Sequence, residues 1–140
     1  MSSTFPSKEW IAEYKNKIDE KPDYKEGGKN WTFGVTVLII SAKPEIGLKE
    51  DFYIYLDLHQ GQCREARTCS LAEAEKQPFV IRGDYDRWKM VLREELEPVK
   101  GMMQGKLKLR GDLPTVVRNI NAAKALVKCA TYVKTKFLDE

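Results

Sequence analysis

Histidine and cysteine are scarce in this chain, which excludes several kinds of site chemistry. The 140 residues include one histidine, His59, and three cysteines, Cys63, Cys69 and Cys129. These residues form neither a Cys-x-x-Cys nor a His-x-x-x-His spacing, so no metal site is expected. With no secretory signal at the start, we expect free thiols in a reducing, cytoplasmic compartment, with a Cys63–Cys69 pair across a hairpin as the alternative.

Long hydrophobic runs and low-complexity tracts are also absent. The longest apolar run, Phe33–Ile40, has eight residues, whereas a membrane-spanning helix needs roughly 20. Glycine (9) and proline (6) are too few for a disordered or repetitive chain. A hydrophobic fraction of 42% and a charged fraction of 32% are typical of a soluble protein with a sizeable core. We therefore interpret residues 1–140 as one domain.

No pattern typical of an enzyme is present. His59 falls on the outer face of a predicted strand, and no nucleophile motif surrounds any serine or cysteine. The stretch Gly101–Lys106 is like a phosphate-binding loop, but it has one residue too few between its glycines, and Leu107 stands where Ser or Thr must reach the metal. Paired acids such as Glu94 and Glu95 fit a solvated surface. We predict a non-enzymatic protein without a cofactor.

Apolar periodicity predicts one helix and four strands in the first part of the chain. Ile11, Tyr14 and Ile18 recur at helical spacing after Pro6, and the helix should end before Pro22, with a loop following it. The four strands are expected over Phe33–Ile40, Ile54–Leu58, the charged edge segment Cys63–Ser70, and Phe79–Ile81. In the first of them, the alternation favours an inner face made of Phe33, Val35, Val37 and Ile39.

The remainder of the chain is predicted to be mostly helical. Asp84 is a good N-cap for a helix that contains Trp88 and Leu92, and Pro98 opens a short helix closed by Gly105. A fifth strand is expected over Lys106–Arg110 and a final long helix after Asp112, extended over residues 126–140. This order predicts an α+β fold: a five-stranded, mostly antiparallel sheet with helices packed on one face.

Positive charge is concentrated near the C-terminus. Between Val99 and Leu138 the sequence has one acid, Asp112, and nine basic residues, namely Lys100, Lys106, Lys108, Arg110, Arg118, Lys124, Lys128, Lys134 and Lys136. A solvated surface or attraction to an anionic membrane or ligand headgroup would both explain this charge. Nucleic acid binding is not expected, because no recognised motif accompanies a sequence pI of about 8.7.

The most specific pattern in the chain begins at Phe79. Its parts, in order, are Phe-Val-Ile-Arg-Gly-Asp at 79–84, then Trp88, Val91 and Leu92, then 98–112, which ends in Gly-Lys-Leu-Lys-Leu-Arg-Gly-Asp. These features resemble the sterol carrier protein family, also called the sterol-binding domain family. The upstream helix and strands agree with that family in order only.

The resemblance implies that sheet and helices enclose an apolar tunnel for a fatty acid, acyl-CoA, phospholipid or sterol-like lipid. The chain is then a cytoplasmic lipid-binding or carrier protein that makes transient contact with an anionic membrane. The residues expected to line the tunnel are Phe33, Val35, Ile54, Leu56, Phe79, Ile81, Trp88, Leu92, Met102, Met103, Leu109, Val116 and Ile120. The alternative is a non-enzymatic interaction module, such as a homodimer, whose apolar groove receives a partner segment or the C-terminal helix.

Overall fold

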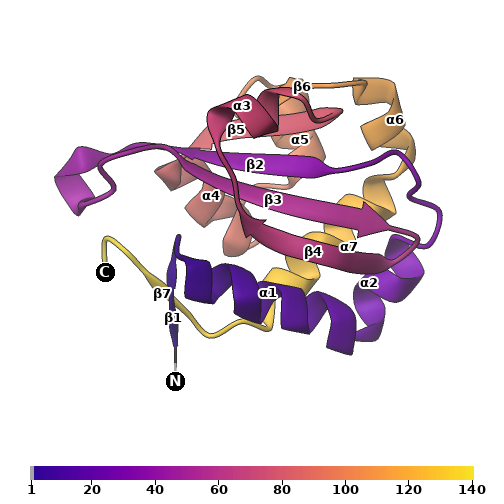
Figure 1. The fold of residues 1–140 in the computed structure, drawn as a ribbon, viewed down its shortest axis with the longest axis horizontal. Coiled ribbons are helices and arrows are strands. Elements are labelled where there is room, and N and C mark those ends of the chain that lie inside the picture. Colours follow the sequence, from indigo (N-terminus) through magenta and orange to yellow (C-terminus); the bar gives the residue numbers. More distant parts are fainter. Residues whose placement is uncertain (1) are drawn as a thin grey trace.

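A five-stranded sheet is the centre of the protein, for which a computed structural model describes residues 2–140 (Figure 1). Its strands lie in the order β4-β3-β2-β5-β6. Their bounds are Thr36–Ser41 for β2, Phe52–His59 for β3, Gln62–Thr68 for β4, Phe79–Asp84 for β5 and Lys108–Arg110 for β6. Only β2 and β5 pair in parallel, and the other neighbours pair antiparallel. The predicted α+β class and mostly antiparallel sheet are confirmed.

Helices cover one face of the sheet, with one exception. The covering helices are α1 (Lys8–Glu20), α2 (Pro22–Gly27), α4 (Tyr85–Leu92), α5 (Pro98–Met103), α6 (Leu113–Arg118) and α7 (Ile120–Thr131). The exception is α3 (Leu71–Glu75), whose Ala74 packs against Val37, Ile39 and Val80 on the opposite face. A 3₁₀ turn, η1, spans Pro44–Ile46. Within residues 2–140, none of the helices is long and apolar enough to cross a bilayer.

The helices begin where the sequence supplies caps. The Asp84 carboxylate accepts a hydrogen bond from the Arg87 backbone N–H at 2.8 Å, so the predicted N-cap of α4 is confirmed. The Ser7 hydroxyl accepts from the Trp10 N–H at 3.0 Å and opens α1, one residue later than Pro6. Glu97 caps α5 through the N–H groups of Val99 and Lys100. Each cap provides an acceptor for N–H groups that have no partner within the helix.

The predicted inner face of the first strand was wrong. The strand begins at Thr36, and the side chains of its residues Leu38 and Ile40 face the helices. Val37 and Ile39 are buried on the other face beneath α3, and Val35 packs beside them. Both faces of β2 are therefore apolar, so alternation between polar and apolar residues could not assign them.

The expected C-terminal helix over residues 126–140 was also wrong. The helical segment is interrupted at Asn119 and ends at Thr131. Thr135–Phe137 then forms strand β7, which pairs in parallel with β1 (Ser3–Phe5). Val133 and Phe137 are buried whereas Lys134 and Lys136 are exposed, so the inward side chains follow a two-residue period. Their spacing of four residues also fits a helix, which explains the incorrect prediction.

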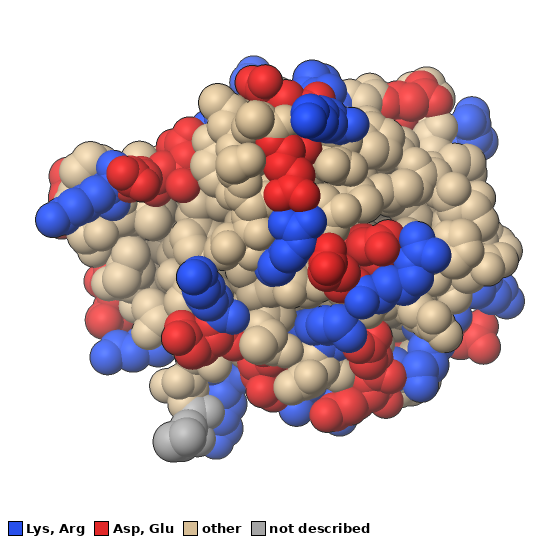
Figure 2. All heavy atoms as spheres, in the orientation of Figure 1, with Lys and Arg blue, Asp and Glu red and all other residues tan. Residues whose placement is uncertain are grey.

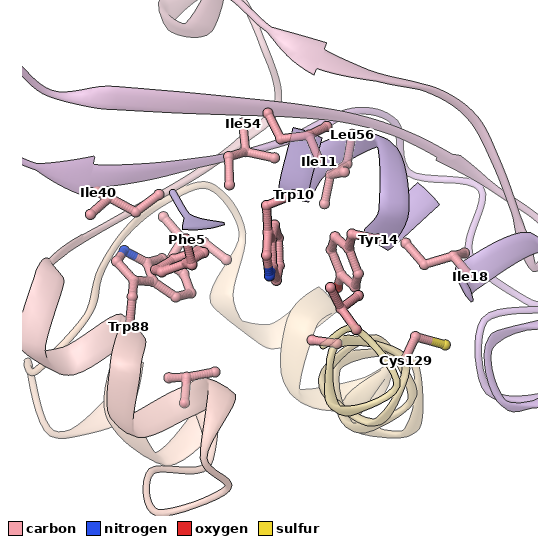
Figure 3. Close-up of a cluster of buried hydrophobic side chains, with 14 of the residues drawn as sticks. Phe5, Trp10, Ile11, Tyr14, Ile18, Ile40, Ile54, Leu56, Trp88 and Cys129 are labelled. Carbon is pink, nitrogen blue, oxygen red and sulfur yellow. The ribbon is translucent and has the colours of Figure 1, made fainter. Parts of the chain in front are cut away.

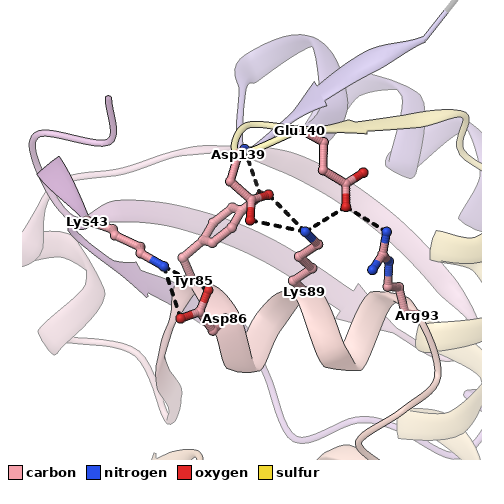
Figure 4. Close-up of polar contacts among 7 residues, drawn as sticks. All are labelled: Lys43, Tyr85, Asp86, Lys89, Arg93, Asp139 and Glu140. Carbon is pink, nitrogen blue, oxygen red and sulfur yellow. Dashed lines mark hydrogen bonds and ion pairs between the residues drawn. The ribbon is translucent and has the colours of Figure 1, made fainter. Parts of the chain in front are cut away.

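The C-terminal segment 132–140 is held against α4 by polar contacts (Figure 4). Lys89 Nζ lies 2.9 Å from an Asp139 oxygen and 2.7 Å from Glu140 Oε2, and Arg93 also binds Glu140, at 2.7 Å. The Tyr85 hydroxyl donates to Asp139 at 2.8 Å. Phe137 packs edge-on against Phe5, with 6.3 Å between ring centroids. The two ends of the described chain thus lie side by side.

Candidate functional site

A cavity of about 110 Å³ lies between the inner face of the sheet and the helices that cover it. The sheet side is lined by Thr36, Leu38 and Ile40 of β2, Ile54, Leu56 and Leu58 of β3, and Phe79 and Ile81 of β5. Residues of the helix side include Trp10, Tyr14, Tyr24, Trp88, Val91, Leu92, Met102, Val116, Ala122, Leu126 and Val127. Almost all of these side chains are apolar, which is typical of a site for an apolar ligand.

Aromatic rings from several separate segments form much of the wall. Figure 3 shows Trp10 and Tyr14 below the sheet residues Ile54 and Leu56, and Trp88 below Ile40. Trp10 and Phe5 meet edge-on with centroids 4.9 Å apart, and Trp31 contacts Phe79 with centroids 5.1 Å apart. These rings are large and have few rotatable bonds, so they give the cavity a defined shape.

Each indole N–H in this wall has a hydrogen-bond acceptor. Trp88 donates to the Ile39 carbonyl at 2.9 Å, Trp10 to the Thr135 hydroxyl at 2.9 Å, and Trp31 to the Gly34 carbonyl at 3.0 Å. Because each N–H group has its acceptor outside the cavity, the rings can contribute apolar surface to the cavity wall. No polar tryptophan atom is left facing the cavity without a partner.

The two lining tyrosines differ in how their hydroxyls are satisfied. Tyr14 donates to the Leu126 carbonyl at 2.8 Å, whereas the buried Tyr24 hydroxyl has no partner within residues 2–140. Burial raises the pKa of both phenols, so both stay neutral at physiological pH. Thr36 and Asn119 are the other polar side chains of the lining, and no Asp, Glu, Lys, Arg or His belongs to it.

Eight residues of the predicted site line this cavity. They are Ile54, Leu56, Phe79, Ile81, Trp88, Leu92, Met102 and Val116. The other five lie outside the lining. Phe33 and Met103 are 44% and 66% exposed, and Val35 packs on the opposite face of the sheet. Leu109 and Ile120 pack against the main core without lining the cavity.

Sequence reasoning missed the contribution of the N-terminal segments. Phe5, Trp10, Tyr14, Tyr24 and Trp31 all belong to the lining. Trp10 and Tyr14 were detectable, since both lie on the apolar face of the predicted first helix. Tyr24 carried no such signal, because the segment that became α2 reads as a loop between Pro22 and Gly28.

The metal-ligating and nucleophilic side chains of residues 2–140 do not form a metal site or a catalytic site. Among residues 2–140 no group of three or more His, Cys, Asp or Glu side chains is placed to hold a metal ion. The three cysteines are free thiols. Burial raises the pKa of Cys63 to about 12 and that of Cys129 to about 11, so neither is an activated nucleophile.

The surface charges fall into two groups. On the face shown in Figure 2, basic and acidic side chains are interspersed. Ion pairs of the chain include Arg64–Asp57 at 3.1 Å and Arg67–Glu73 at 2.6 Å. The nine basic residues between Val99 and Leu138 behave differently. All nine are exposed, and none forms an ion pair within the described part of the chain.

Comparison with known proteins supplies independent information on this fold. The model of the SCP-2 sterol transfer family matches residues 14–124. A crystal structure of sterol carrier protein 2 is 30% identical and superimposes with a TM-score of 0.81, covering 91% of this chain and 97% of that one. No curated protein sequence matches the chain significantly.

Two further solved structures share the architecture. A conserved hypothetical protein of Thermus thermophilus, described as a possible sterol carrier protein, is 30% identical with a TM-score of 0.83, covering 97% of this chain and 94% of that one. Palmitated SCP2L2 from Aedes aegypti is 16% identical with a TM-score of 0.55, covering 81% of this chain and 90% of that one. The latter shows similarity of fold alone.

Proposed function

This chain belongs to the SCP-2 sterol transfer family, and we propose that it is a non-enzymatic carrier that holds the hydrocarbon part of a lipid in the cavity described above. Lipid binding or transfer is the general activity of that family. The observation that carries the proposal is a cavity between sheet and helices with no ionised side chain in its lining.

The energetics of such a site favour a long hydrocarbon chain. Each CH₂ transferred from water contributes about 0.8 kcal/mol, so sixteen carbons supply on the order of 12 kcal/mol before costs. Ordering the chain and losing its translational freedom remove several kcal/mol of this. The remainder corresponds to a dissociation constant in the micromolar range. The palmitate in the Aedes aegypti protein is a ligand of this chemistry on the same fold.

The cavity must widen to accept a whole chain. Its volume of about 110 Å³ is below the roughly 300 Å³ of the smallest common ligand sites. Met102 and Leu92 are the side chains best suited to move, because both are only partly buried and unbranched Met readily changes rotamer. We therefore expect binding to shift the α4 and α5 side of the cavity more than the sheet.

The unpaired basic surface supports contact with an anionic membrane during loading or release. Each Lys or Arg held near such a surface contributes about 1 kcal/mol. In this proposal the protein acts in the cytoplasm, and lipid is its partner. One form of the alternative interaction module places the C-terminal helix in the apolar groove, whereas Thr135–Phe137 is a strand that pairs with the protein's own N-terminal strand. The form in which the groove receives a partner segment is the second candidate function.

Two adjacent methionines provide a direct test. Met102 lines the cavity and Met103 is exposed. Met102→Gln places an amide in an apolar wall and should weaken uptake of a fluorescent fatty acid at least tenfold, because the amide loses its hydration without gaining a partner. Met103→Gln should change it less than twofold. Equal effects of the two substitutions, or no uptake by the unmodified protein, would contradict the proposal.

A further inference from the structure

The Tyr24 hydroxyl is the buried polar side-chain atom that the fold leaves without a partner within residues 2–140. Tyr24 has no exposed surface, and its side chain belongs to the cavity lining. Buried hydroxyls are nearly always hydrogen-bonded, because an unpaired one loses the free energy of its hydrogen bonds to water and gains no other hydrogen bond. The neighbouring Tyr14 obeys this rule through Leu126. The exception at Tyr24 needs a physical explanation.

The position of the Tyr24 ring is fixed by close packing. A Cβ at residue 28 would lie 2.3 Å from the ring carbon that bears the hydroxyl and 2.4 Å from its neighbour Cε1, so only glycine leaves room for the ring. The helix that carries Tyr24 is itself packed on α7, where a Cβ at Gly27 would meet Ala125. The Tyr24 ring is therefore closely packed where it lies, with no exposed surface.

The cavity lining determines which chemical groups the hydroxyl can meet there. A carboxylate or ammonium group in the cavity would lose its hydration with no opposite charge to replace it, because the lining has no ionised side chain. An alcohol, ester or ketone loses far less on burial and offers an oxygen to which a phenol can donate. The chemistry that satisfies Tyr24 from inside the cavity is thus neutral and oxygen-bearing.

From these observations we propose that the Tyr24 hydroxyl anchors the buried end of the lipid by a hydrogen bond to a neutral hydroxyl or carbonyl oxygen. The inference rests on the proposed carrier function and adds a specificity to it. A lipid with a neutral oxygen at its inner end is preferred over one of equal length that ends in a methyl group or a carboxylate.

Three ligands of equal length test the proposal on the whole protein. Binding of dodecan-1-ol, dodecane and dodecanoate is measured by displacement of the neutral fluorescent probe N-phenyl-1-naphthylamine, with Tyr24→Phe beside the unmodified protein. Tyr24→Phe should weaken dodecan-1-ol about 3- to 10-fold, the value of one hydrogen bond. Binding of dodecane should change less than twofold. Equal changes for alcohol and alkane, as when a water is the partner of Tyr24, would overturn the proposal.

Two controls separate this result from loss of structure and from failure of the carrier function. Tyr24→Phe should unfold at the same or a higher urea concentration than the unmodified protein, since an unpaired buried hydroxyl has been removed. Tyr14→Phe removes the hydrogen bond from the Tyr14 hydroxyl to the Leu126 carbonyl, so it should lower stability and affect alcohol and alkane equally. If the unmodified protein binds the probe and none of the three ligands, the carrier function fails and the proposal for Tyr24 fails with it.

Discussion

The indole nitrogen of Trp88 donates a hydrogen bond to the backbone carbonyl of Ile39 across a distance of 2.9 Å. Trp88 is part of the cavity wall on α4, whereas the side chain of Ile39 is buried on the other face of the sheet under α3. One hydrogen bond therefore joins the helix side of the cavity to the central strand. Through that strand it connects both apolar layers of the protein.

Trp88→Phe should lower the free energy of unfolding by about 2–3 kcal/mol, from the lost hydrogen bond and the space left by the smaller ring. Urea denaturation measures this change. Phe33→Leu is the matched control, because Phe33 is 44% exposed and its truncation should cost less than about 0.5 kcal/mol. Equal effects of the two substitutions would mean that the Trp88 contact does not stabilise the fold.

Attachment of the C-terminal segment 132–140 should depend on pH. Lys89, with Tyr85, lowers the pKa of Asp139, and Lys89 also lowers that of Glu140. When the pKa of a carboxyl group is lower in the folded state than in the unfolded chain, the ionised carboxylate stabilises the folded state at pH values above the ordinary carboxyl range near pH 4. This stabilisation is lost as the pH falls through the lowered pKa. Hydrogen exchange at the Thr135–Phe137 amides, corrected for intrinsic rates, should therefore lose protection between pH 5 and pH 3.

Lys89→Gln is the control for that pH effect, since it removes the partner that both acids share. Protection at residues 135–137 should already be reduced at pH 7 in this variant, and its dependence on pH should become weaker. Protection that is the same in both proteins at every pH would show that β1–β7 pairing and Phe137 packing hold the segment without the ion pairs.

How far the sequence could predict this structure depended on whether the two faces of an element differ. In β3, Ile54, Leu56 and Leu58 alternate with Tyr53, Tyr55 and Asp57, and the inner face was assigned correctly. In β2 both faces are apolar, and the assignment was wrong. A local sequence pattern indicates which residues are buried, but it does not indicate which layer of the protein covers them.

The site was predictable in part for a related reason. The segment that resembles the family begins at Phe79, and six of the residues predicted from there onward, from Phe79 to Val116, line the cavity. Trp10 and Tyr14 were recognisable as core, but nothing in the sequence showed that the N-terminal helix crosses the same cavity. That information lies in the contacts of α1 with α7 and β4, which join residues far apart in the chain.

The three thiols should differ in reactivity in the folded protein. Burial raises the pKa of Cys63 to about 12 and of Cys129 to about 11, so almost no thiolate forms at pH 8. Cys69 is only partly buried. Titration with a disulfide reagent at pH 8 should label one thiol quickly in the folded protein and three in urea. Cys69→Ser should abolish the fast phase; a fast phase that persists would contradict the burial of the other two.

Binding to anionic vesicles should depend on the unpaired cations rather than on net charge. Lys124 and Lys128 are exposed on α7, four residues apart and hence on one helix face, and neither has an ion-pair partner in the described chain. With each cation contributing about 1 kcal/mol near an anionic surface, Lys124→Gln/Lys128→Gln should weaken binding to phosphatidylserine vesicles at least tenfold.

The control is the double variant Lys15→Gln/Lys17→Gln on α1. It makes the same change in net charge but removes lysines paired with Asp19, Glu13 and Glu20. That control should bind nearly as well as the unmodified protein in vesicle sedimentation at 0.1 M salt. If the two double variants weaken binding equally, binding depends only on total charge, and the basic surface between Val99 and Leu138 is not the docking surface.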